Sequence, residues 1–283
     1  MSKNYISDFT YENFMKGEYF DLTNTMYHGG TTFSSGALPK WDLLNRTFMI
    51  KRCGTDSDGS FLTDYLNETL VYAFCHLLKI NCAYYRFVLI KYFDMELNTV
   101  IECPAVITEI FPGELIYYRD IRRIYNLGSI NDQIIDFTDR FKVGSHLNDL
   151  LLIDYIFNQQ DRHSKNFGMV GGRLSPIYDS GSCLFYHIPD KLLNDQLIKD
   201  IPRHKTFGKR QDELLEFSLK YIEPEFSFEF DEELLKTSTD KALDIVTGYS
   251  GIRLDFIRRL MKARIVNAGQ IYAKTRRLAR VCR

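Results

Sequence analysis

Several features that mark specialised classes of protein are missing from this sequence. It has one tryptophan, and its 36 basic and 37 acidic side chains nearly cancel to a formal net charge of -1, which argues against a chain built throughout to coat nucleic acid. No apolar run approaches the roughly 18 residues that a membrane-spanning helix needs, and residues 1–14 contain no continuous apolar core of a signal peptide. We therefore expect a cytoplasmic protein without a membrane span.

The cysteines are too sparse and too irregularly spaced for a disulfide scaffold or a zinc site. The six of them include no CxxC pair, so we expect reduced and mostly buried thiols. The rest is ordinary globular material, with 45% hydrophobic and 26% charged residues over 283 positions and with 21 Phe and 18 Tyr. This composition excludes disordered and collagen-like chains. It predicts one large domain or two packed lobes, with a core rich in aromatic rings.

The first part of the chain alternates strand patterns around one helical pattern. β-Branched and aromatic residues typical of strands fill residues 46–52, 84–93 and 99–111. Residues 61–80 place leucines and aromatics at helical spacing. Helical patterns dominate after residue 113, except for a tight hairpin predicted at Gly171-Gly172. We expect an α+β protein with a small β-rich N-terminal lobe, residues 1–112, and a mainly helical C-terminal lobe, residues 113–283.

The string DRHSKNFGMVGGRLSPIYDSG, residues 161–181, carries the most informative polar side chains. Asp161 and Asn166 lie five positions apart in a polar loop, and Asp179 follows the predicted hairpin. Phosphoryl transfer to a hydroxyl needs a carboxylate that orients and deprotonates the acceptor, and an amide oxygen plus a second carboxylate that hold Mg²⁺ on the phosphates. The hairpin offers a rigid way to bring Asp179 back beside Asn166.

The run DRHSKNF followed by LSPIYDSGSCLF resembles the catalytic and metal-binding segments of HipA-like serine/threonine kinases, including the shorter CtkA-like members. The DRHxxN arrangement is also similar to the catalytic loop of phosphatidylinositol kinases. The resemblance implies a two-lobed protein-kinase-like fold in which Asp161 is the catalytic base and Asn166 and Asp179 are the Mg²⁺ ligands. His163 would order the loop through hydrogen bonds. Lys165 either reaches the transferred phosphate or is simply solvated.

A kinase reading also requires a lysine on a strand and a glutamate on the next helix. Lys51 ends the apolar run FMIK, and Glu68 lies in the helical pattern that follows, within an Asn-Glu dipeptide that is also HipA-like. A buried carboxylate would stabilise an ammonium group held among phosphates. Each residue taken alone is commonplace, a strand-end lysine and a solvated glutamate. Their order relative to the downstream motif favours the kinase interpretation.

The segment HGGTTFSSGALPK, residues 28–40, offers groups that suit an anion. Ser35, Gly36 and Lys40 supply a hydroxyl, a close backbone approach and a positive charge, and the segment resembles the HipA phosphate-binding loop. An ordinary glycine-rich loop is the alternative. HipA-like kinases are regulated by phosphorylation in this loop, so the resemblance implies self-inactivating phosphorylation within Thr31 to Ser35. Glu109 and Phe111 stand where a kinase hinge would offer backbone groups to adenine.

The C-terminal segment is strongly basic. Residues 253–283 contain ten basic side chains and one acidic side chain, interleaved with apolar residues at helical spacing. One reading is a helix whose charged face contacts phosphate backbone or an acidic protein. We favour the other, a solvated helix that offsets the acidic remainder of the chain.

The function implied by the resemblance is that of an ATP- and Mg²⁺-dependent serine/threonine protein kinase. It would transfer the γ-phosphate to a protein hydroxyl, autophosphorylate, and belong to a toxin–antitoxin system with a separate regulatory or antitoxin partner. Two alternatives stay open. The same loop would serve a lipid or small-molecule kinase, because it fixes the phosphoryl donor and not the acceptor. The chain could also be a nucleotide-binding regulator that acts on nucleic acid through its basic C-terminal helix.

Overall fold

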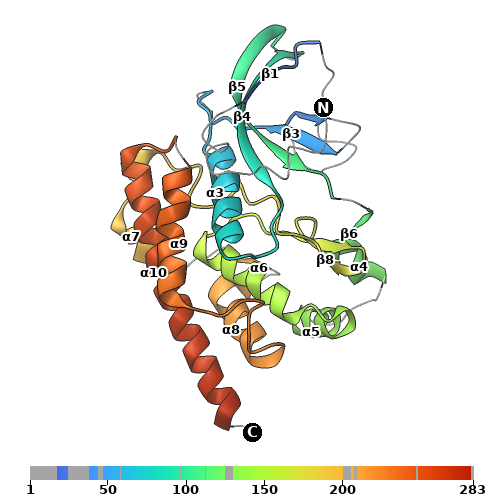
Figure 1. Ribbon diagram of the computed structural model, residues 1–283, viewed down its shortest axis with the longest axis vertical. Coiled ribbons are helices and arrows are strands. Elements are labelled where there is room, and N and C mark those ends of the chain that lie inside the picture. Colours follow the sequence, from blue (N-terminus) through green and yellow to red (C-terminus); the bar gives the residue numbers. More distant parts are fainter. Residues whose placement is uncertain are drawn as a thin grey trace.

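A mixed sheet forms one end of the protein and helices form the other (Figure 1). The computed structural model describes residues 18–24, 38–43, 47–57, 59–95, 97–111, 113–124, 130–199, 205–206, 209–246 and 248–281. The sheet has the strand order β1-β4-β5-β3-β2. Its strands are β1 (Glu18–Asp21), β2 (Lys40–Leu43), β3 (Phe48–Arg52), β4 (Tyr85–Asp94) and β5 (Thr99–Glu109). The expected α+β class is confirmed.

Buried and exposed side chains alternate along β4, so one face of this sheet forms a hydrophobic core of its own. Val88, Ile90 and Tyr92 are fully buried, whereas Leu89 and Phe93 between them are exposed, as the two-residue period of a strand requires. The tryptophan of the chain, Trp41 on β2, packs edge-on against Tyr92 with ring centroids 5.1 Å apart. All neighbouring strands run antiparallel except β1, which pairs with β4 in parallel. Strand β1 was not among the strands predicted from the sequence.

Helix α3 (Asp64–Leu77) joins the sheet to the helices (Figure 1). It contacts β4 and β5 on one side and α9 on the other, so most of its residues are buried, including polar Asn67 and Glu68. The helix ends where Lys79 takes a positive φ of 58°. A helix buried on all sides carries its polar side chains into the interior, where they need partners.

The helical end is built around α6. The helices are α4 (Tyr118–Ile124), α5 (Ile130–Phe141), α6 (Gly144–Ile156), α7 (Asp195–Lys199), α8 (Gln211–Tyr221), α9 (Glu232–Ile245) and α10 (Gly251–Val281). Helix α6 contacts α5, α8 and α10, and its residues from Leu147 onward are buried. The long apolar run of this helix therefore forms the centre of the larger core.

Short strands interrupt the helical end. A three-stranded sheet consists of β6 (Leu115–Tyr117), β7 (Gly168–Val170) and β8 (Arg173–Leu174), and a two-stranded one of β9 (Lys205–Thr206) and β10 (Lys209–Arg210). The hairpin predicted at Gly171-Gly172 is confirmed, with φ of 57° and 79° at the two glycines. Residues 190–199 form a 3-10 turn, Asp190–Leu192, and short α7 rather than one continuous helix, because the Asn194 side chain accepts the N–H groups of Gln196 and Leu197 and starts a new helix.

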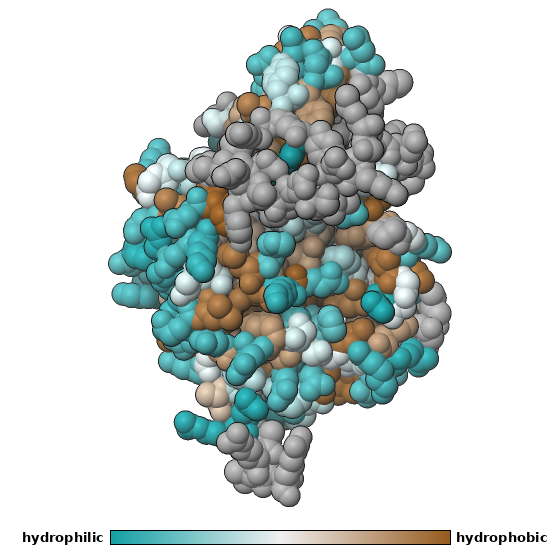
Figure 2. All heavy atoms as spheres, in the orientation of Figure 1, coloured by the Kyte–Doolittle hydropathy of each residue, from teal (hydrophilic) through white to brown (hydrophobic). Residues whose placement is uncertain are grey.

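The basic C-terminal segment forms α10, and its charges pair with acidic side chains of the same chain. Arg258 and Lys262 both contact Asp240 of α9, and Lys274 contacts Glu216 of α8. Figure 2 shows a largely hydrophilic surface over the side formed by α7, α9 and α10. This pairing favours the solvated-helix reading. Across the described ranges, none of the helices is both long and apolar enough to cross a membrane.

Candidate active site

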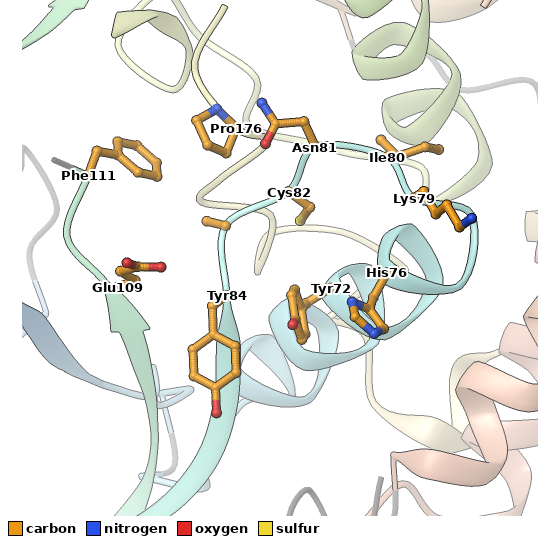
Figure 3. A pocket seen from close by; sticks show the side chains of 11 residues that line it. Tyr72, His76, Lys79, Ile80, Asn81, Cys82, Tyr84, Glu109, Phe111 and Pro176 are labelled. Atoms are coloured by element: carbon orange, nitrogen blue, oxygen red, sulfur yellow. The ribbon is translucent and has the colours of Figure 1, made fainter. Parts of the chain in front are cut away.

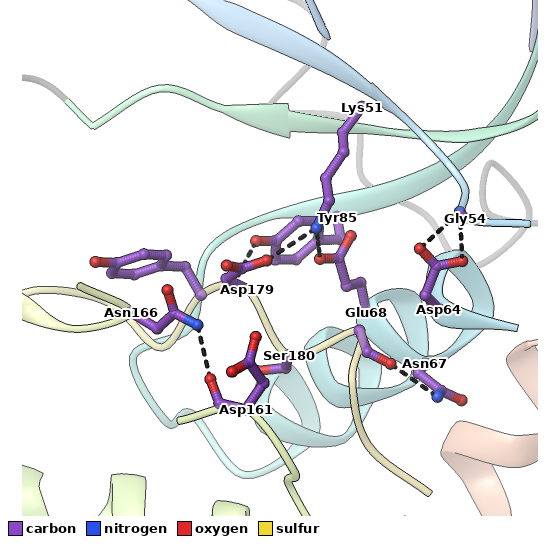
Figure 4. Close-up of polar contacts among 12 residues, drawn as sticks. Lys51, Gly54, Asp64, Asn67, Glu68, Tyr85, Asp161, Asn166, Asp179 and Ser180 are labelled. Atoms are coloured by element: carbon purple, nitrogen blue, oxygen red, sulfur yellow. Dashed lines mark hydrogen bonds and ion pairs between the residues drawn. The ribbon is translucent and has the colours of Figure 1, made fainter. Parts of the chain in front are cut away.

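Three charged side chains from distant parts of the chain meet between the sheet and the helices. Lys51 Nζ on β3 lies 2.7 Å from Oε1 of Glu68 on α3 and 2.9 Å from Oδ1 of Asp179 (Figure 4). The side chains of Lys51 and Glu68 are 15% and 2% exposed, but that of Asp179 is 44% exposed. The structure thus brings together three of the predicted site residues, and it leaves one carboxylate open to a ligand.

The ionisation of this cluster follows from burial and from its one cation. Burial works against a charged Lys51, but the carboxylates of Asp179 and Glu68 outweigh it and raise the Lys51 pKa. The Lys51 ammonium in turn lowers the pKa of Asp179 to about 2. Burial raises the pKa of Glu68 to about 7, against the opposing charge of Lys51. At neutral pH the open carboxylate is therefore ionised beside a protonated lysine.

The segment after Asp179 is fastened directly to α3. Asn67 donates from Nδ2 to the carbonyl oxygens of Gly181 (3.0 Å) and Cys183 (2.8 Å), and its Oδ1 accepts from the Tyr249 hydroxyl. A Cβ at Gly181 would lie 3.1 Å from the Asp64 carbonyl oxygen and 3.3 Å from Cγ of Glu68. Glycine at this position lets the segment approach α3 closely, and this close approach brings Glu68 near Asp179.

The predicted catalytic loop lies beside this cluster. Asp161 is exposed, and within the described residues its carboxylate makes no hydrogen bond. Asn166 is buried and donates from Nδ2 to the Asp161 carbonyl oxygen at 2.8 Å (Figure 4). That bond fixes the amide and leaves its Oδ1 available. The roles predicted for Asp161 as base and for Asn166 as a Mg²⁺ ligand stay predictions.

Arg162, inside the same motif, is a residue that sequence reasoning missed. Its side chain is fully buried against Asp154 of α6, with Nη2 to Oδ1 at 3.0 Å. It also donates to the carbonyl oxygens of Asn166 and Tyr178, both at 2.7 Å, and to Ser180 Oγ at 3.2 Å. Arg162 therefore ties the catalytic loop to the segment that carries Asp179. Only the three-dimensional contact with Asp154 shows this, since no local spacing links the two.

Gln159 is a second link that the sequence did not signal. Its buried side chain accepts the backbone N–H groups of Gln160 (2.8 Å) and Asp161 (3.2 Å), and donates to the Asp179 carbonyl oxygen at 3.3 Å. The Asp179 N–H donates to the Tyr85 hydroxyl at 2.9 Å. These bonds hold Asp179 in a left-handed conformation, with a φ of 53°, that non-glycine residues rarely adopt.

The remaining loop residues take local roles. His163 is exposed, and its Nδ1 accepts the backbone N–H of Lys165 at 3.3 Å, which agrees with the loop-ordering role expected for it. The Lys165 carbonyl oxygen accepts the Tyr178 hydroxyl at 2.7 Å. Within the described residues the Lys165 ammonium makes no hydrogen bond or ion pair, so the two roles predicted for it stay open.

The predicted phosphate loop is described only at its end. Ser35 and Gly36 lie outside the described residues, and so does the segment Thr31 to Ser35. Lys40 begins β2 directly opposite Lys51 in the strand register and is 7% exposed. Burial, and then the charge of Lys51, lower the Lys40 pKa. Two lysines on paired strands therefore face the same small region.

Glu109 is the last residue of β5 and Phe111 lies two residues later, and their side chains line a pocket that does not include the Lys51 cluster. They line a pocket of about 500 Å³ together with the C-terminal half of α3 and the chain that leads into β4 (Figure 3). None of the charged residues of the Lys51 cluster lines this pocket. The predicted contact of the Glu109 and Phe111 backbone with adenine stays a prediction.

The donor set suits a hard cation. Asn166 Oδ1 and the second carboxylate oxygen of Asp179 are oxygen ligands of the kind that Mg²⁺ prefers, and Mg²⁺ keeps several waters, so two protein ligands suffice. The described part of the chain contains no cluster of three or more His, Cys, Asp or Glu side chains that could hold a metal.

Comparison with known proteins supports the fold described above. The crystal structure of the proinflammatory kinase CtkA from Helicobacter pylori matches with a TM-score of 0.59 at 16% identity, over 90% of this chain and 98% of that chain. The chain therefore shares its overall fold with that structure. A HipA chain in a complex with HipB and operator DNA, from Shewanella oneidensis MR-1, matches with a TM-score of 0.42 at 15% identity, over 84% of this chain and 65% of that chain. No family model and no curated protein matches the chain.

Proposed function

We propose that the protein is a serine/threonine protein kinase that transfers the γ-phosphate of ATP to a protein hydroxyl with the help of Mg²⁺. The observation that carries this proposal is the Lys51–Glu68–Asp179 cluster. A lysine on β3 is held by a buried glutamate of α3 beside a half-open ionised aspartate. A kinase needs this combination to bind and orient a triphosphate, and the fold similarity to CtkA supports the same conclusion.

Each residue has a role in this proposal. Lys51, held by Glu68, binds phosphate oxygens, and Lys40 on the paired strand adds charge to the same region. Asn166 and Asp179 hold Mg²⁺, which when bound neutralises charge on the phosphates. Ser35 and Gly36, with the hinge at Glu109 and Phe111, remain the predicted nucleotide contacts.

Asp161 is the proposed base. Its side chain is exposed and its carboxylate makes no hydrogen bond among the described residues, so an acceptor hydroxyl can approach it. Its backbone is fixed by Gln159 and Asn166, which limits the carboxylate to a small range of positions. A base held in place beside a bound phosphoryl donor lowers the barrier by orientation as well as by proton removal.

The decisive experiment compares two isosteric variants. Asp161→Asn should retain nucleotide binding and lower phosphoryl transfer from labelled ATP by about 10² to 10⁴, the range for loss of a positioned base. Asp179→Asn should instead weaken the Mg²⁺-dependent part of ATP binding, because a charged ligand is lost. Binding is read as thermal stabilisation by Mg-ATP, with ATP plus EDTA as control. Wild-type turnover in Asp161→Asn, or no stabilisation of the folded wild type at millimolar Mg-ATP, would contradict the proposal.

The acceptor is identified by the same assay. With Mg-ATP alone, we expect phosphate to enter the protein itself within Thr31 to Ser35, where about -1.5 to -2 added charge would repel the ATP phosphates. Peptide mapping and a loss of ATP affinity check this. Transfer to lipid or to a small molecule, with no protein labelled, would keep the kinase assignment and replace the acceptor. An active enzyme whose segment stays unmodified would remove the self-inactivation idea alone.

A further inference from the structure

Among the described residues, two pairs of cysteine thiols lie near each other. Cys53, after β3, lies near Cys103 of β5, and Cys75 of α3 lies near Cys82, which precedes β4. All four are free cysteines. The proposed phosphoryl transfer uses none of them, and the two pairs differ in their access to solvent.

The fold itself brings Cys75 and Cys82 together. The Cys75 carbonyl oxygen accepts the N–H groups of Leu78 (3.2 Å) and Ile80 (2.9 Å), so the chain reverses around Cys75 at the end of α3. The returning chain then runs alongside the helix, and the rings of Tyr72 and Tyr84 pack edge to face with centroids 5.2 Å apart. These backbone bonds and the ring contact keep Cys82 close to Cys75.

Access separates the two pairs. Cys82 is half-buried and lines the 500 Å³ pocket, together with the basic side chains of His76 and Lys79 (Figure 3). Cys75, fully buried, lies behind it. Cys53 and Cys103 are 1% and 2% exposed and do not line the pocket. Partly exposed thiols near positive charge are the ones that oxidise.

We propose that Cys82 is a peroxide-accessible modification site that forms a disulfide with Cys75. A peroxide that enters the pocket oxidises the Cys82 thiol to a sulfenic acid and is itself reduced to water or an alcohol. The Cys75 sulfur then attacks the sulfenic sulfur, an S–S bond forms, and the sulfenic oxygen leaves as water with the Cys75 proton. The two sulfurs together lose two electrons, which the peroxide accepts.

The cross-link would fasten the end of α3 to the chain leading into β4. It replaces the bond from Cys82 Sγ to the Ile177 carbonyl oxygen at 3.3 Å, two residues before Asp179. The backbone bonds from Ala83 N to Ile177 O (2.8 Å) and from Ile177 N to Asn81 O (3.0 Å) do not involve the thiol and remain. The oxidised protein should therefore stay folded and melt higher than the reduced protein, by about 5 °C for a short closed loop.

Peptide mapping of the full chain after hydrogen peroxide treatment tests the proposal. Trypsin cuts after Lys79, so Cys75 and Cys82 fall in separate peptides, 53–79 and 80–86, while Cys103 lies in 92–119. We expect a 53–79 to 80–86 link, lighter by two hydrogen atoms and reversed by dithiothreitol. Fragment ions assign the linked sulfur to Cys75, because Cys53 shares its peptide.

The buried pair is the matched control. The hydrogen bond from Cys53 lowers the pKa of Cys103, so thiol chemistry alone would favour oxidation there, and only access favours Cys82. Cys103→Ser should keep the 53–79 to 80–86 link, and Cys82→Ser, which retains a donor for Ile177, should abolish both the link and the gain in melting temperature. Any of four results would overturn the proposal. Cys82 could be oxidised to sulfinic acid while Cys75 stays free, or Cys82 could fail to react. Peptide 53–79 could link to 92–119 as fast as to 80–86, or a link to peptide 281–283 could form. If Cys82→Ser does not fold, the wild-type map decides alone.

Discussion

Two ionic clusters lie within a few residues of each other in this protein, and they are built differently. The Arg162–Asp154 pair is sealed, with side chains 0% and 1% exposed, and the guanidinium bonds a carboxylate, a hydroxyl and two carbonyl oxygens. In the Lys51 cluster one ammonium directly contacts two carboxylates, and Asp179 is left 44% exposed. The donors of the first cluster are all used, whereas the second cluster leaves a carboxylate open to solvent.

This difference separates the charges that stabilise the fold from the charges that are available to bind a ligand. A buried ion pair with all donors satisfied holds geometry, and its removal exposes an uncompensated charge. An excess carboxylate in a partly open site shifts pKa values instead, as at Glu68, where burial moves the pKa to about 7. A bound cation would balance the Lys51 cluster, whereas nothing needs to be added to the Arg162 cluster.

The largest expected effect breaks the sealed cluster. Arg162→Met leaves the Asp154 carboxylate buried without a partner, and the free energy of unfolding should fall by about 3–5 kcal/mol. Arg276→Met, at an exposed arginine that pairs with Glu225, should change it by less than about 1 kcal/mol. Urea unfolding measures both.

A double variant sharpens this result. Asp154→Leu combined with Arg162→Met removes both charges and should recover part of the loss, because no buried ion remains. Recovery should be incomplete, since the carbonyl oxygens of Asn166 and Tyr178 lose their donor. If Arg162→Met were no worse than Arg276→Met, the sealed cluster would not be structural.

The second prediction uses pH to probe the open cluster. Glu68 has a folded pKa of about 7 against 4.5 for the ordinary group, so between these values the folded state holds more protons than the unfolded state. The free energy of unfolding should therefore fall as pH rises from about 5 to 7 and then level off, by about 1–3 kcal/mol in total. Asp179, whose pKa is lowered to about 2, acts in the opposite sense, and its contribution is lost only below about pH 4.

Glu68→Gln should remove the fall between pH 5 and 7. Glu213→Gln, at an exposed glutamate of α8, should keep it. Saturating Mg-ATP should also reduce the fall if the bound cation compensates the carboxylates. If Glu68→Gln leaves the pH profile unchanged, a group other than Glu68 causes the fall in the free energy of unfolding between pH 5 and 7.

The two clusters also differ in how far they could be predicted from the sequence. Lys51, Glu68 and Asp179 were predicted because a known motif orders them along the chain, and the structure brings them together. The Arg162–Asp154 pair was not predicted, because Asp154 lies in an apolar helical run where nothing local marks it as a partner. Gln159 and Tyr85 accept hydrogen bonds from backbone N–H groups. Nearly every residue has such a group, so the sequence does not indicate which one is bound. Strand β1 pairs in parallel with a strand far along the chain, which no local pattern encodes.

The smallest expected effect concerns an ion pair that is exposed to solvent and lies outside the sequence motifs of the candidate site. Lys274 of α10 lies 2.6 Å from Glu216 of α8, with side chains 61% and 36% exposed. Water already solvates both groups, so a double-mutant cycle of Lys274→Ala and Glu216→Ala should give a coupling of about 0.2–1 kcal/mol. The coupling should shrink further in 1 M salt, where the screening length is about 3 Å. Coupling near that of the Arg162–Asp154 pair would mean that α10 is fastened by its charges rather than by its apolar face, and that burial is not what separates the strong ion pairs of this protein from the weak ones.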